Sequence, residues 1–144
     1  MNDNQLAPYG AFTLRAALGI MFIAHAYLKI VVFTVPGFEA FLGQVGLPGI
    51  FAWPIILAEL VGGIAILTGF YARLVSIALL PVLVGAFFVH TGNGWLWNAP
   101  NGGWEYPAFL VVAAVVHILI GDGAFAIKPV NLPVAVPALR QQAE

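Results

Sequence analysis

The sequence predicts an all-α integral membrane protein of four transmembrane helices, with a short interfacial or re-entrant helix between the first two. Three observations support this fold class. Hydrophobic residues make up 62% of the chain and charged residues 8%, whereas soluble domains average roughly 45–50% and 25%. Four apolar stretches approach or exceed the length needed to cross a bilayer, about 20 helical residues. Segments rich in glycine, proline and asparagine separate them, as expected of connecting loops.

The predicted spans cover residues 11–33, 51–70, 73–91 and 105–120. Pro36 and Gly37 end the first span, and the segment that follows is too short to cross a membrane. Its apolar residues recur at helical spacing, which predicts a helix lying at the interface or re-entering the membrane; they are Phe38, Phe41, Leu42 and Val45.

The connections complete the predicted organisation. Only Tyr71 and Ala72 separate spans two and three, so these spans should form an antiparallel hairpin. Residues 1–127 are expected to form one transmembrane domain. Residues 128–144 contain three prolines, which predicts an irregular cytoplasmic tail.

Basic residues predict the orientation of the spans. They fall on the side that holds both termini and the second-to-third connection, so the positive-inside rule places both termini in the cytoplasm; they are Arg15, Arg73, Lys128 and Arg140. The tryptophans fall at the opposite face, as an interfacial belt would; they are Trp53, Trp95, Trp97 and Trp104. The expected location is the cytoplasmic (inner) membrane of a prokaryote.

Composition excludes several classes of function. The net charge is −1 without a Lys/Arg cluster, which gives no footprint for nucleic acid. The absence of cysteine excludes thiolate metal sites, iron–sulfur clusters and thiol redox chemistry by this chain. Any electron transfer must use a bound cofactor or a partner. No metal site is predicted, and no complete catalytic constellation is present, so enzymatic activity is undecided and at most that of an accessory redox subunit.

Glu59 is the residue around which the predicted site is organised. It is the single charged residue between Ile50 and Phe70, and a carboxylate in mid-membrane costs roughly 2.5–3.5 kcal/mol on insertion scales. Glu59 shares a helical face with Gly62 and Gly63, which let a neighbouring helix approach closely. It should therefore point into protein rather than lipid and have a partner there.

Other ionisable residues are predicted to meet Glu59 in one half-cavity of the outer leaflet. Lys29 lies at a similar depth, less than roughly 13 Å below the outer boundary at ~1.5 Å per residue, and His25 lies one turn away. His90 and Glu105 fall near the outer ends of spans three and four. These five residues form the candidate ligand-binding set, with Lys29 and Glu59 as an ion pair.

A structural interpretation competes with the binding site. A Glu–Lys pair and a buried histidine can simply hold helices together, and the same interpretation is favoured for His117, which lies nearer the cytoplasmic side. An acid such as Glu105 in the first turn of a helix is stabilised by the helix dipole alone. Haem ligation by His25 and His90 is disfavoured because their estimated depths differ by a turn or more.

The series LRAALGIMFIAHAYLKI, F-x-x-F-L-x-x-x-G-L-P, AELVGGIAILTGFYARL, His90 and NGGWEYP resembles the DoxX family of small four-helix membrane proteins. The resemblance covers about residues 14–126. Ala26 departs from the family pattern, which usually has glycine after the histidine. The positions that carry the resemblance are Arg15, Gly19, His25, Lys29, Glu59, Gly62, Gly63, Arg73, His90, Gly103 and Glu105.

The resemblance implies the four-helix membrane fold and a link to redox enzymes. The leading expectation is a membrane subunit of an oxidoreductase system that binds a quinone or similar small molecule, with a redox protein as partner. The alternatives are a non-catalytic anchor or scaffold for a soluble enzyme, and a small-molecule or lipid carrier. The sequence leaves homo-oligomerisation open.

Overall fold

Helices and loops make up the fold over residues 3–130, which the computed structural model describes. Within those residues the only β-type pairing is an isolated bridge between Phe70 and Lys128. The all-α prediction is confirmed. The elements are α1 (Asp3–Tyr27), the π-helical turn η1 (Leu28–Val32), α2 (Val35–Gln44), η2 (Gly49–Phe51), α3 (Ala52–Thr68), α4 (Ala72–His90), η3 (Thr91–Asn93) and α5 (Glu105–Ile120).

Three helical stretches are long and apolar enough to cross a membrane, judged by length and composition: Gln5–Val32, Gly49–Thr68 and Ala72–Asn93. These stretches and the composition agree with an integral membrane protein. The apolar helix α5 has 16 residues and is about 24 Å long, against ~30 Å of hydrocarbon, so a fourth crossing remains a prediction. The first helix begins at Asp3 rather than near residue 11, and it continues through Pro8, which removes one backbone hydrogen bond in its second turn.

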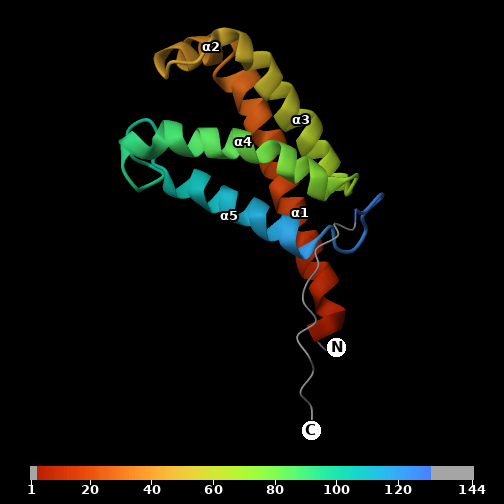
Figure 1. Ribbon diagram of the computed structural model, residues 1–144. Helices are drawn as coiled ribbons and strands as arrows, with labels where there is room; N and C mark the ends of the chain where they lie inside the picture. Colours follow the sequence, from red (N-terminus) through yellow and green to blue (C-terminus); the bar gives the residue numbers. More distant parts are fainter. Residues whose placement is uncertain (1–2, 131–144) are drawn as a thin grey trace.

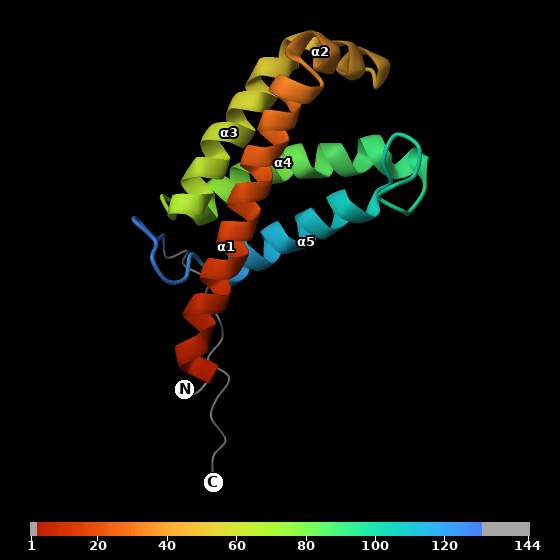
Figure 2. The same ribbon diagram turned by 180° about the vertical axis from the view of Figure 1, so that it is seen from behind.

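The helices form two antiparallel pairs that meet at one end (Figure 1). One pair is α1 with α3, the other is α4 with α5, and the second pair leaves the first at a steep angle in both views (Figure 2). This arrangement differs from four near-parallel helices. Apolar side chains of α1, α3, α4 and α5 form the core where the pairs meet; its buried members include Leu18, Phe22, Ile66, Leu79 and Leu110.

A second, smaller core lies beneath α2, which covers the ends of α1 and α3 remote from the crossing. It contains Ala26, Phe38, Leu42, Ala52 and Ile56. Helix α2 begins after Thr34, whose hydroxyl accepts a hydrogen bond from the Gly37 amide at 3.3 Å. The short helix therefore exists between the first two long ones, while its placement at the membrane interface remains a prediction.

Glycines allow α1 and α3 to touch backbone to backbone. A Cβ at Gly19 would lie 2.7 Å from the Leu67 amide nitrogen and 2.8 Å from the Gly63 carbonyl oxygen. A Cβ at Gly62, on the adjacent face of α3, would lie 2.7 Å from Cδ1 of Leu79 in α4. Gly63 therefore faces α1 and Gly62 faces α4, as their position beside Glu59 suggested.

The turn between α3 and α4 binds the segment that follows α5. Gly69 ends α3 in the left-handed conformation, φ 74°, and its carbonyl accepts from the Lys128 amide at 3.0 Å. The Tyr71 amide donates to the Lys128 carbonyl at 3.0 Å. The start of the predicted tail is thus held against this turn, and the rest of the tail, residues 131–144, lies outside the described residues.

Candidate functional site

Lys29 and Glu59 form an ion pair between α1's π-helical end and α3. The Lys29 ammonium donates to both carboxylate oxygens, at 2.9 Å to Oε1 and 2.7 Å to Oε2. The two side chains are 14% and 7% exposed, so water screens the pair only weakly. The ammonium also lies 5.4 Å from the centre of the Phe38 ring in α2. The pair predicted from the sequence is therefore present and largely enclosed.

Local backbone structure places Lys29 in this position. The α-helix of α1 changes at Leu28 into a π-helical turn, in which the Phe33 amide donates to the Leu28 carbonyl at 2.9 Å. Such turns are rare and frequently occur at functional sites. The close approach of α1 to α3 at Gly19 and Gly63 brings the two helices near enough for the side chains to meet.

His25 lies on the same helix and stacks on Tyr106 of α5. The ring centres are 5.7 Å apart and the planes differ by 22°. Nδ1 of His25 lies 2.7 Å from the Met21 carbonyl oxygen, and because a carbonyl only accepts, this nitrogen carries the proton. The stack joins the α1–α3 pair to the α4–α5 pair one helical turn from Lys29.

His90 and Glu105 do not join this group. They lie at the end of α4 and the start of α5, next to the 91–104 loop and away from α2 (Figure 1). His90 Nδ1 donates to the Ala86 carbonyl at 2.7 Å, and Glu105 Oε1 accepts from the Trp97 amide at 2.8 Å. Among the described residues, His90 and Glu105 thus bond to backbone at their own end of the α4–α5 pair, whereas Tyr106, the residue after Glu105, reaches His25.

A second polar cluster lies where the helix pairs meet, and it is centred on Asp122. The carboxylate accepts from the backbone amides of Arg73, at 3.0 Å, and Val130, at 2.9 Å. The Asp122 carbonyl accepts from the Arg15 guanidinium at 2.6 Å. Arg15 and Asp122 are 1% and 4% exposed, so a cationic and an anionic side chain are both buried between the first helix and the segment that follows α5.

Arg73 closes the end of α5 in the same cluster. Its guanidinium donates to the carbonyls of Ile118, at 2.9 Å, and Leu119, at 3.0 Å. These carbonyls belong to the last turn of a helix, which has no partners for them within the helix. The arginine therefore caps α5 and complements the negative end of its dipole.

His117 and Ser76 extend the cluster into the core. Ser76 Oγ and His117 Nδ1 are 2.9 Å apart, and His117 Nε2 lies 3.6 Å from Asp122 Oδ1. The serine, histidine and aspartate order is that of a hydrolase triad, but the 3.6 Å between histidine and carboxylate is too long for a hydrogen bond, and all three side chains are buried in the core. The interpretation of His117 as an interhelical contact matches this geometry.

Sequence reasoning missed Tyr106, Ser76 and Asp122. Tyr106 follows Glu105 at the start of a span, where a tyrosine is ordinary. Asp122 lies between two glycines and suggested only a helix stop. The sequence did contain one indication of the role of Asp122. The chain has only six acidic residues, and an aspartate next to a membrane span usually pairs with a basic residue.

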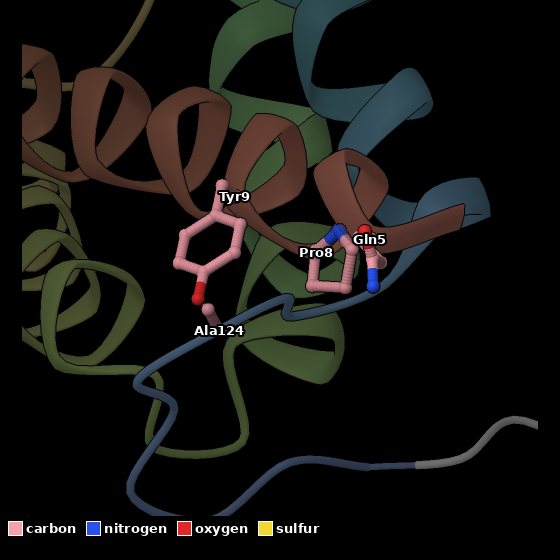
Figure 3. A pocket seen from close by; sticks show the side chains of 4 residues that line it. All are labelled: Gln5, Pro8, Tyr9 and Ala124. Atoms are coloured by element: carbon pink, nitrogen blue, oxygen red, sulfur yellow. The ribbon is translucent and has the colours of Figure 1, made fainter. Parts of the chain in front are cut away.

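Two open, shallow depressions flank the place where the last segment crosses α1. One is lined by Gln5, Pro8, Tyr9 and Ala124 (Figure 3), and the Ala124 amide donates to the Pro8 carbonyl at 2.9 Å. Pro8 is about 30 Å from Lys29 along α1 at ~1.5 Å per residue. These depressions are therefore remote from the ion pair.

Comparison with known proteins identifies the family. The DoxX family profile matches residues 10–92, more than half of the chain. The chain belongs to the DoxX family. A protein of Bacillus subtilis (strain 168) named "Putative oxidoreductase CatD" is 28% identical to this DoxX protein over 127 residues, 88% of this chain and 90% of the relative. No solved structure matches it. The matched region contains the ion pair, His25 and both glycine contacts between α1 and α3.

Proposed function

We propose that this DoxX protein is an integral membrane subunit of an oxidoreductase system and binds a quinone or similar small molecule beside the Lys29–Glu59 pair. The observation that carries the proposal is the placement of this buried pair, with His25 one turn away, inside helices that are long enough to span a membrane. Ionisable groups at such depth usually mark a functional site. The name of the B. subtilis relative, which aligns over most of both chains, supports the link to redox chemistry.

The chemistry of the chain restricts its role to binding, positioning and proton handling. Without cysteine it supplies no thiol or iron–sulfur centre, so electrons pass through a bound cofactor or a partner enzyme. Lys29 fixes the Glu59 carboxylate through two hydrogen bonds, and His25 of α1 stacks on Tyr106 of α5 one turn away. His90 and Glu105 lie at the outer end of the α4–α5 pair. Glu105 accepts a hydrogen bond from the loop that connects these helices.

The proposed topology has four crossings, with both termini in the cytoplasm of a prokaryotic cell and the ion pair in the outer half of the inner membrane. It follows from the positive-inside rule, with α5 as the fourth crossing. Arg15 and Arg73 then lie at the cytoplasmic end, beside Asp122, and the 91–104 loop lies outside.

The direct test is purification in mild detergent, followed by mass spectrometry of the extracted lipids and of copurified proteins. A quinone retained in stoichiometric amount, and lost in Glu59→Gln, supports the proposal. A preparation that retains neither a quinone nor a partner enzyme contradicts it.

One observation favours a second role, a non-catalytic anchor for a soluble enzyme. Both charges of the Lys29–Glu59 pair are directed at each other, as in a purely structural contact. An anchor requires a stable stoichiometric partner in native membranes and no retained small molecule. The same purification therefore separates the two roles, and a homo-oligomer would appear in its mass analysis.

A further inference from the structure

Tyr106 carries a hydroxyl group that is buried and has no hydrogen-bond partner among the described residues. Buried polar atoms in native proteins almost always have a partner, and an exception requires an explanation. The ring of Tyr106 packs against the core where the helix pairs meet and stacks on His25 at 5.7 Å. The hydroxyl is thus held in one place with its hydrogen-bonding capacity unused.

His25 supplies the complementary group. Its Nδ1 proton is donated to the Met21 carbonyl at 2.7 Å, so in the neutral ring Nε2 carries a lone pair and accepts. Tyr106 and His25 together offer one hydrogen-bond donor and one acceptor on two stacked rings.

The neighbouring charges indicate what kind of molecule suits these groups. Lys29 and Glu59, one turn along α1, neutralise each other through two hydrogen bonds of 2.9 and 2.7 Å. Glu105, next to Tyr106 in sequence, accepts a hydrogen bond from the Trp97 amide. Within residues 3–130, the charges of the ion pair are thus not available to neutralise an ionic ligand. A charged molecule would lose its hydration without compensation in so apolar a setting.

We infer that the Tyr106 hydroxyl and His25 Nε2 hold a neutral molecule that carries a carbonyl or hydroxyl oxygen. The inference rests on the proposed function, because it names the groups that bind the molecule proposed there. A quinone meets the requirement in both redox states, since its carbonyl oxygen accepts from Tyr106 and the hydroxyl of its quinol form donates to His25.

Tyr106→Phe tests the inference, because it removes a hydroxyl that bonds to no other group in the part of the chain that the structure describes and should leave the fold intact. Purified protein is titrated with decylubiquinone, and binding is followed by quenching of tryptophan fluorescence. Loss of one hydrogen bond should weaken binding about five- to tenfold, with an unchanged unfolding midpoint. Tyr27→Phe is the matched control, because Tyr27 lies half a turn from His25 and is 59% exposed; this variant should bind like the wild type.

His25→Phe provides a second variant that keeps a ring for the stack and removes the acceptor. It should weaken binding of the reduced form, decylubiquinol, more than that of decylubiquinone. If both variants bind the quinone as tightly as the wild type does, the hydroxyl holds an ordered water only. The inference is then overturned, while the proposed function survives. If the wild type binds neither form, the quinone proposal fails and the inference fails with it.

Discussion

A double-mutant cycle can distinguish a structural role of the Lys29–Glu59 pair from a role in ligand binding. In Lys29→Met the carboxylate is left in an environment where it is 7% exposed, and in Glu59→Gln the ammonium is left without its partner. Breaking a buried pair from one side typically costs about 3–5 kcal/mol, because an uncompensated charge stays buried. We expect each single variant to lose that much stability.

The double variant Lys29→Met with Glu59→Gln contains no unmatched charge. Replacing a buried pair as a whole is often nearly neutral, so its stability should return to within about 1–2 kcal/mol of the wild type, and the coupling energy should be large. The control is Glu39→Gln, because Glu39 lies on the exposed face of α2 and its loss should change stability little.

The assay measures thermal unfolding and decylubiquinone binding on the same four proteins in the same detergent. If the pair serves a binding site, the double variant regains stability and does not regain binding. Equal recovery of both properties would refute the functional role and leave Glu59 as an interhelical contact. Additive losses of stability would refute the pairing itself.

Three further predictions follow from other contacts. Asp122→Ala should destabilise the protein by about 2–5 kcal/mol in a thermal unfolding series, because the amides of Arg73 and Val130 lose their acceptor and a buried donor without a partner costs about 1–3 kcal/mol; a change below 1 kcal/mol would contradict this. Gly19→Ala should cost about 1–3 kcal/mol through overlap with the α3 backbone, whereas Gly85→Ala, which meets nothing within 4 Å, should be neutral or stabilising by up to about 1 kcal/mol. A reporter after Glu144 should be active in the cytoplasm and a tag near Asn98 should be accessible only from outside; labelling of both from one side would refute four crossings.

Two kinds of contact could be predicted from the sequence. One is the pairing of isolated charges, and the other is the close approach of helices at glycine. Lys29 and Glu59 are isolated in apolar helices at similar estimated depth, so each is the natural partner of the other. Gly62 and Gly63 share the face of Glu59, and the structure places neighbouring helices against both. Such inferences use only periodicity and the cost of burying a charge.

The angle between the helix pairs could not be predicted in the same way. It decides which side chains of α5 reach α1, such as Tyr106 on His25. It depends on side-chain packing at the crossing, which leaves no periodic signal. The π-helical turn at Leu28–Val32 has no sequence signature either. Asp122 contacts Arg15 across 107 residues of chain, and nothing local to either residue indicates the other.

The long separation between Arg15 and Asp122 has a consequence for how the protein is made. The first helix enters the membrane carrying both Arg15 and Lys29, and Lys29 meets Glu59 once 30 more residues have been added. Arg15 must wait for 107 residues, about 5–20 seconds of synthesis at roughly 5–20 residues per second. During that interval its charge is compensated by water, lipid headgroups or the insertion machinery. Synthesis of the segment that follows α5, rather than insertion of any single helix, is therefore the step that closes this end of the molecule.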